Sequence, residues 1–123
     1  MAGERILVVD DNAQNLKLAR VLLQSEGYEV RTATDATEAL KVLEGFFPRA
    51  VLMDLQLPDL DGLELTRRLK QQPKYTQLKV IALTAYAMKG DREKALAAGC
   101  DAYVTKPLDA ELLLRTLLEQ LKG

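Results

Sequence analysis

The feature that most constrains the fold is a regular alternation of short apolar runs with helical patterns along the chain. Five runs rich in apolar and β-branched residues predict strands at 5–10, 28–33, 50–54, 79–83 and 102–105. The first, third and fourth runs (ILVV, AVLM and VIAL) are apolar almost throughout, as strands covered by helices on both faces must be. The sequence therefore predicts a central parallel sheet in a doubly wound α/β fold.

The segments between the runs carry helical apolar stripes. Two stripes stand out, one at Leu16, Ala19 and Leu23 and one at Leu114, Leu117, Leu118 and Leu121. Because these spacings place the side chains on one face of a helix, we expect both stripes to face the sheet.

Residues that start or end helices stand where the pattern needs them. Asp35 and Glu38 have the spacing of a capping box, and Asp109 can cap the last helix. Gly27, Gly45 and Gly99 each follow a helical run, where a residue in the left-handed conformation commonly ends the helix. Each predicted helix thus has a start or a stop signal.

Composition limits the chemistry. The 123 residues suit one domain, residues 1–123, and a formal charge of −1 gives no basic surplus for nucleic acid. No apolar run approaches the roughly 18 residues of a membrane span, and no signal peptide pattern opens the chain, so we expect a cytoplasmic protein. With one cysteine and no histidine, disulfides, ordinary zinc sites and histidine-based triads lack their parts. The chemistry must use carboxylates, hydroxyls and lysine.

Polar residues stand at the ends of the predicted strands. Asp10 and Asp11 close the first, Asp54 closes the third, Thr84 follows the fourth and Lys106 follows the fifth. In a doubly wound fold these ends share one edge, where ligands bind. Three crowded carboxylates repel one another unless a cation joins them, and hard oxygen ligands suit Mg²⁺. The pattern predicts a magnesium site.

Asp54 is the expected nucleophile, because it alone ends a central strand and leads into a loop able to admit a donor. With its charge offset by a metal, such a carboxylate can attack a phosphoryl group and form an aspartyl phosphate. Phosphoryl transfer also needs charge stabilisation, which the Lys106 ammonium and the Thr84 hydroxyl would supply.

Four motifs, VVDDN (8–12), LMDLQLP (52–58) with Gly62, ALTA (82–85) and YVTKP (103–107), resemble the response-regulator receiver domains of two-component systems. The resemblance spans nearly the whole chain. Segments 85–91 and 99–103 are most similar to stand-alone cell-cycle-type regulators and to the receivers of hybrid histidine kinases. A stand-alone protein and a receiver cut from a larger protein both fit.

The resemblance implies a five-stranded sheet of order 2-1-3-4-5 and assigns roles to the motif residues. Mg²⁺ would be held by Asp10, Asp11, Asp54 and the main-chain carbonyl of Gln56. Asp54 would take the phosphoryl group, and Thr84 and Lys106 would bind its oxygens.

The resemblance also implies a switch. Thr84 would move toward the phosphoryl group while Tyr103 turns inward, and this would reshape the face of the fourth helix, fifth strand and fifth helix, where a downstream protein would dock. It further implies a cis bond between Lys106 and Pro107. From the sequence, Tyr103 is equally well read as a core residue.

The expected function is a phosphorylation-activated switch in a phosphorelay, which catalyses its own phosphorylation and slowly hydrolyses the product. Because the chain has no histidine, the phosphohistidine must come from a sensor histidine kinase or a histidine phosphotransfer protein. Gln56 and Tyr86 would border the path of the hydrolytic water, where a bulky Tyr86 would lengthen the phosphorylated lifetime. Alternatively, Tyr86 only extends the docking surface.

Two rival functions remain open. One is a phosphatase or phosphotransferase using Asp54 on small substrates, although such enzymes commonly carry a second acid where this chain has Gln56. The other is a module of the same fold that binds FMN, which an absorbance spectrum would reveal. Taken singly, the acids also have ordinary interpretations, such as Asp11 or Asn12 capping the first helix.

Overall fold

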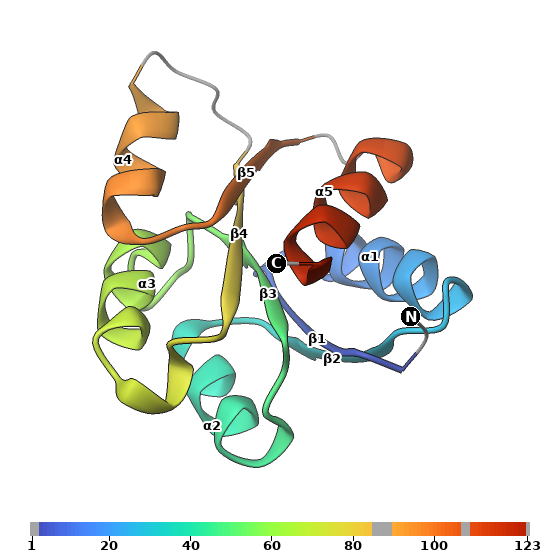
Figure 1. Ribbon diagram of the computed structural model, residues 1–123, viewed down its shortest axis with the longest axis horizontal. Helices are drawn as coiled ribbons and strands as arrows, with labels where there is room; N and C mark the ends of the chain where they lie inside the picture. Colours follow the sequence, from blue (N-terminus) through green and yellow to red (C-terminus); the bar gives the residue numbers. More distant parts are fainter. Residues whose placement is uncertain (1–2, 85–89, 107–108, 123) are drawn as a thin grey trace.

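A five-stranded parallel sheet forms the centre of the protein (Figure 1). The computed structural model describes residues 3–84, 90–106 and 109–122. The strands are β1 (Arg5–Val9), β2 (Glu29–Ala33), β3 (Ala50–Asp54), β4 (Lys79–Thr84) and β5 (Ala102–Thr105). They lie in the order β2-β1-β3-β4-β5, so the predicted fold class and strand order are confirmed.

Helices cover both faces of the sheet (Figure 1). One face carries α1 (Ala13–Ser25) and α5 (Ala110–Lys122), and the other carries α2 (Ala36–Phe46), α3 (Gly62–Lys70) and α4 (Asp91–Ala98). A short 3₁₀ turn, Pro73–Tyr75, lies between α3 and β4. Within the ranges given above, no helix combines the length and apolar character needed to cross a membrane.

The two helical layers enclose two separate cores, because successive strand side chains point to opposite faces. In β1, Ile6 and Val8 join the cluster under α1 and α5, while Leu7 and Val9 join the cluster under α2, α3 and α4. All four are essentially inaccessible to solvent. This double coverage explains why the central strands are apolar throughout.

The predicted helix starts are confirmed. Asp35 Oδ1 accepts from the Glu38 amide at 2.8 Å, and Glu38 Oε1 accepts from the Thr34 amide at 2.7 Å. Asp109 accepts from the Leu112 amide at the start of α5, and Asn12 accepts from two amides of α1. These side chains satisfy amide donors that a helix leaves unpaired in its first turn.

Two local predictions are wrong. Leu118 was expected to face the sheet, but it is 43% exposed, and Leu113 is buried instead with Leu117 and Leu121, at spacings of four residues. Gly45 does not end α2. The helix continues for one more residue, Phe46, whose side chain is buried in the core.

The left-handed residue after α2 is accordingly Phe47, with φ 52°, rather than Gly45. Gly27 and Gly99 have φ 92° and 110°, so both adopt the predicted left-handed conformation.

Candidate functional site

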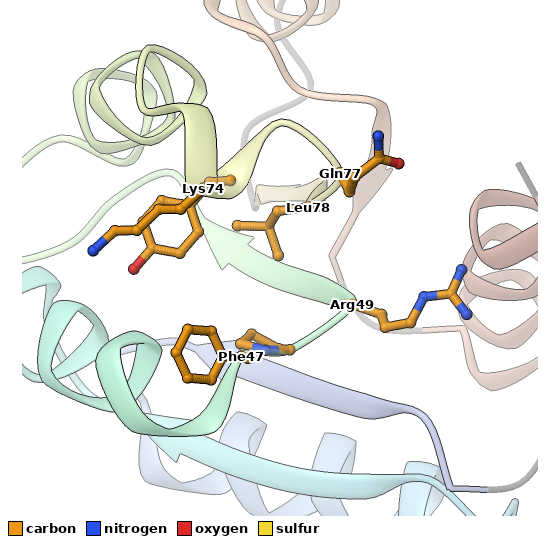
Figure 2. Close-up of a pocket in the computed structure, with 7 residues that line it drawn as sticks. Phe47, Arg49, Lys74, Gln77 and Leu78 are labelled. Atoms are coloured by element: carbon orange, nitrogen blue, oxygen red, sulfur yellow. The ribbon is translucent and has the colours of Figure 1, made fainter.

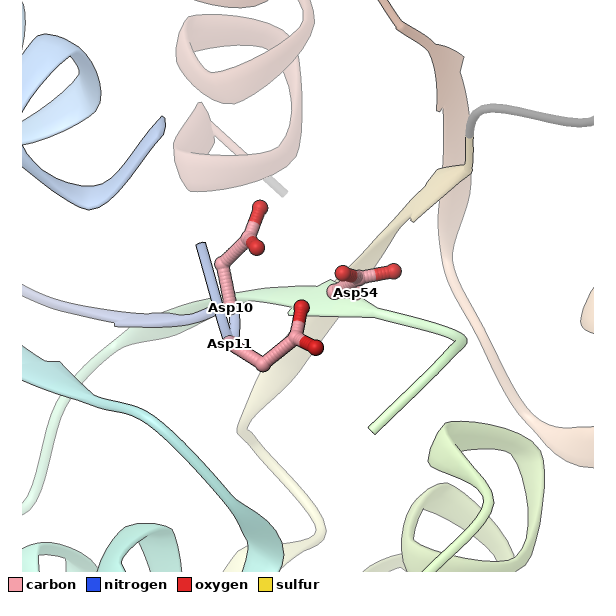
Figure 3. Close-up of side chains that lie close together, drawn as sticks. All are labelled: Asp10, Asp11 and Asp54. Atoms are coloured by element: carbon pink, nitrogen blue, oxygen red, sulfur yellow. The ribbon is translucent and has the colours of Figure 1, made fainter. Parts of the chain in front are cut away.

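Three carboxylates meet at the carboxyl edge of the sheet (Figure 3). Asp10 and Asp11 follow β1, and Asp54 is the last residue of β3. One oxygen from each lies within 4.8 Å of the others. Asp10 and Asp54 are buried, at 1% and 4% exposure, whereas Asp11 is exposed. We call these three residues the acid cluster.

Lys106 places an ammonium against the two buried acids. Its Nζ lies 2.8 Å from Asp10 Oδ2 and 3.1 Å from Asp54 Oδ2. Its main-chain amide donates to the Thr84 carbonyl at 2.7 Å, which fixes the start of the segment after β5 against the end of β4. Lys106 therefore joins the ends of β1, β3 and β5 through a single side chain.

The site carries more negative charge than Lys106 balances. Burial raises the pKa of Asp54 above its ordinary value, and the Gln56 amide and Lys106 offset this only in part. Burial would lower the pKa of Lys106, but its hydrogen bonds to Asp10 and Asp54 and their charges outweigh this, so its pKa is raised. Three carboxylates face a single ammonium, so an added cation would be favourable.

Main-chain amides orient the buried carboxylates. The Asn12 amide donates to Asp10 Oδ1 at 2.9 Å, and the Gln56 amide donates to Asp54 Oδ1 at 3.0 Å. Gln56 belongs to the β3–α3 loop (residues 55–61), and its side chain is exposed. Each buried acid thus has one oxygen held by backbone and the other directed to Lys106.

Gly62 allows the chain to pass close behind Asp54. A Cβ atom at this position would lie 2.6 Å from the Asp54 carbonyl oxygen and 2.8 Å from Leu55 Cα, both backbone atoms that cannot move aside. The Gly62 amide also donates to the Leu55 carbonyl at 3.1 Å, which closes the β3–α3 loop. The glycine of the sequence motif is therefore explained by close backbone approach.

The other predicted residues lie at or near the same edge. Thr84 ends β4 and is buried, and its strand neighbours are β3 and β5. Tyr103 is half-buried in β5 and packs against the core cluster under α2, α3 and α4. Tyr86 and the bond between Lys106 and Pro107 lie outside the described residues.

The donor set of the acid cluster suits a hard divalent cation. Three carboxylate oxygens within 4.8 Å of one another can share one ion, and oxygen-only ligands favour Mg²⁺ or Ca²⁺ over softer metals. An acidic metal site is therefore present where the strand ends predicted it.

Sequence reasoning missed Asp59. This exposed residue of the β3–α3 loop accepts hydrogen bonds from α2, which lies 22 to 23 residues away in the chain. No motif signals such a contact, because Asp59 resembles any loop acid when read from the sequence.

A hollow lies at the opposite edge of the sheet (Figure 2). Phe47 and Arg49 border it before β3, and Lys74 and Leu78 border it before β4. None of its lining residues carries a carboxylate, in contrast to the acid cluster at the other edge. It plays no part in the site described above.

Fold and site together define a doubly wound domain with an acidic metal site at the carboxyl edge of its sheet. Comparison with known proteins agrees. The profile of the response regulator receiver domain matches residues 6–118. The chain therefore belongs to the response regulator receiver domain family.

Individual relatives extend the match. The polar-differentiation response regulator DivK of Brucella ovis is 40% identical over 112 residues, which are 91% of each chain. The receiver domain of a sensor histidine kinase from Pseudomonas aeruginosa, solved with a magnesium ion coordinated in its active site cleft, is 38% identical with a TM-score of 0.89 over 99% of this chain and 100% of that one. A CheY-like receiver domain protein from Methanospirillum hungatei is 36% identical with a TM-score of 0.89, over 98% and 95% of the two chains.

These findings establish the function at the level of the family. The protein is a phosphorylation-activated response regulator switch with an acidic site at Asp10, Asp11 and Asp54. As a receiver of a two-component system, it takes a histidine kinase as partner.

Proposed function

We propose that Asp54 accepts a phosphoryl group from a phosphohistidine in a magnesium-dependent reaction, within a single receiver domain over residues 1–123. The observation that carries this proposal is the packing of three carboxylates within 4.8 Å, with Lys106 bonded to both buried ones. The donor is the phosphohistidine of a sensor histidine kinase or of a histidine phosphotransfer protein. We place the protein in the cytoplasm, because ATP-dependent histidine kinases act in that compartment.

Phosphorylation needs one bond to form and one to break. An Asp54 carboxylate oxygen attacks the phosphorus, a phosphorus–oxygen bond forms, and the phosphorus–nitrogen bond breaks with its electron pair leaving on the imidazole. The Gln56 amide holds Asp54 Oδ1 during this step. The Lys106 ammonium, already 3.1 Å from Asp54 Oδ2, and the Thr84 hydroxyl stabilise the negative phosphoryl oxygens.

Asp10, Asp11, Asp54 and the main-chain carbonyl of Gln56 are the residues that would hold Mg²⁺. When bound, the ion offsets the charge that the carboxylates and the phosphoryl oxygens bring together. The excess negative charge of the site supports this assignment, as does the magnesium ion in the receiver domain from Pseudomonas aeruginosa.

Thr84 and Tyr103 form the proposed switch. Thr84 moves toward the phosphoryl group, Tyr103 turns inward, and the face of α4, β5 and α5 changes shape for a downstream protein. Two features support this: Thr84 ends the strand beside Asp54, and Tyr103 already packs on the core beneath α4. A local charge would thus bias a two-state element.

The phosphoacceptor assignment is tested by Asp54→Asn. The variant should keep its fold but take up no label from acetyl phosphate or from a phosphorylated kinase, because the amide is a poor nucleophile. Asp61→Asn is a matched control, since Asp61 is an exposed acid that caps α3 from the adjacent loop. The label on wild type and control should be lost in alkali, as acyl phosphates are. Undiminished labelling of folded Asp54→Asn would contradict the proposal.

A further inference from the structure

The β3–α3 loop is tied to a distant helix by one side chain. Asp59 Oδ1 accepts from the Ala36 amide at 2.9 Å, and Asp59 Oδ2 accepts from the Thr37 amide at 3.0 Å and the Thr37 hydroxyl at 2.8 Å. All three donor groups belong to residues in the first turn of α2. Asp59 therefore joins the loop after β3 to the helix after β2.

Backbone hydrogen bonds fix both ends of this loop. An additional side-chain contact can therefore affect only the position of its middle part. The Leu55 amide donates to the Leu83 carbonyl at 3.0 Å, and the Gly62 amide donates to the Leu55 carbonyl at 3.1 Å. Between these points Leu57 and Leu60 pack against the core cluster under α2, α3 and α4, and such apolar contacts have no fixed direction. Asp59 adds three directional bonds to this segment.

A carboxylate suits this contact for a physical reason. The first turn of α2 presents unpaired amides and the positive end of the helix dipole. Asp35 takes the Glu38 amide, and Asp59 takes the amides of Ala36 and Thr37. The Ala36 amide, with Thr37, holds the pKa of Asp59 below its ordinary value despite some desolvation, so the charged form persists at neutral pH.

We propose that Asp59 is a positioning residue for magnesium-dependent phosphorylation, a role that rests on the proposed function above. By fastening the β3–α3 loop to α2, it sets the position of Gln56, three residues earlier. The Gln56 amide donates to Asp54 Oδ1 at 3.0 Å, and its carbonyl would be a ligand of the metal. A loop released from α2 would misplace both groups together.

A purely structural interpretation of Asp59 is that it caps α2 and does nothing more. Asp35 separates the two interpretations, because it caps the same helix, carries the same charge, and has no contact with the loop among the hydrogen bonds above. Loss of either carboxylate weakens the start of α2. Only loss of Asp59 also frees the loop.

The test compares Mg²⁺ affinity by calorimetry in wild type, Asp59→Asn and Asp35→Asn, at a temperature where all three are folded. Asp59→Asn should raise the Kd for Mg²⁺ about tenfold, as loss of an outer partner of a metal ligand typically does. It should also slow phosphorylation by acetyl phosphate at subsaturating Mg²⁺. Asp35→Asn should bind Mg²⁺ as wild type does, even where its melting temperature falls equally.

Thr37→Val provides a second variant with unchanged charge. It removes one of the three bonds to Asp59, so Mg²⁺ affinity should fall by a smaller factor in the same direction. Unchanged affinity in Asp59→Asn, or an equal loss in Asp35→Asn, would overturn the positioning role and leave the proposed function standing. Failure of wild type itself to bind Mg²⁺ would instead overturn the proposed function, and the positioning role with it.

Discussion

Asp11 is the exposed member of the acid cluster, and this sets it apart from Asp10 and Asp54. The two buried acids already share the Lys106 ammonium, whereas no ion pair to Asp11 is found among the described residues. Asp11 therefore adds charge to the site without disturbing the buried contacts. Of the three carboxylates, that of Asp11 is therefore the one best placed to bind the metal and nothing else.

Asp11→Ala should weaken Mg²⁺ binding strongly and change folding stability little. The removal takes away one carboxylate ligand, and surface substitutions usually change the free energy of unfolding by less than about 0.5 kcal/mol. Calorimetric titration with MgCl₂ measures the first quantity and urea unfolding in EDTA the second. Equal Mg²⁺ affinity in wild type and variant would remove Asp11 from the proposed ligand set.

Single residues should also set the lifetime of the phosphorylated protein, as Asp11 should set its Mg²⁺ affinity. From the resemblance to receiver domains, we expect Gln56 and Tyr86 to border the in-line approach of water to the phosphoryl group. We expect Tyr86→Ala to shorten the lifetime several-fold without preventing phosphorylation, because a bulky ring excludes water. The decay of purified phosphoprotein in excess Mg²⁺ measures this. Identical decay rates would leave Tyr86 as a surface contact only.

Among the elements, α5 shows most clearly how packing divides similar residues. Leu117 is fully buried under the sheet, and Leu118, the next residue, is 43% exposed. Leu117→Ala should lower the free energy of unfolding by about 2 to 5 kcal/mol, because it removes core contacts and leaves a cavity.

Leu118→Ala is the matched control, since it makes the same chemical change in the same helix. Its cost should stay within about 0.5 kcal/mol. Urea denaturation of both variants measures the difference. Comparable losses in the two would mean that α5 packs through a different face.

The strands could be predicted to within a residue or so because each is a short apolar run bounded by polar ones. The buried face of α5 could not be predicted. Two overlapping apolar stripes, one beginning at Leu113 and one at Leu114, both reach Leu121. Only the position of the neighbouring strands selects between them. The acid cluster followed from strand ends, but Asp59 did not, because its partners are remote in sequence and its own context is ordinary.

At the scale of the whole molecule, the buried acid of the site lowers the stability of the folded state. The pKa of Asp54 is raised in the folded protein, mainly by burial, so the fold favours its protonated form. At pH values above the ordinary carboxyl pKa of 3.8, ionised Asp54 therefore destabilises the folded state relative to a neutral residue. Below that pH the carboxyl is protonated in both states and the effect vanishes.

Asp54→Asn should accordingly raise the melting temperature at pH 7 in EDTA. The gain over wild type should shrink as the pH falls toward 4, because wild-type Asp54 then becomes neutral as well. Thermal denaturation followed by circular dichroism at a series of pH values measures this. A variant that melts below wild type at pH 7 would show that the contact with Lys106 outweighs the burial of Asp54.

The position of Lys106 in the sequence also determines when the site is completed during synthesis of the chain. Lys106, the residue that pairs with Asp10 and Asp54, stands 96 and 52 positions after them, in the segment that follows β5. During synthesis both acids therefore leave the ribosome before the residue that supplies their counter-charge. Competence to receive a signal is thus acquired only after the ribosome has passed Lys106, and chains that stop before this residue would be unable to intercept phosphoryl groups.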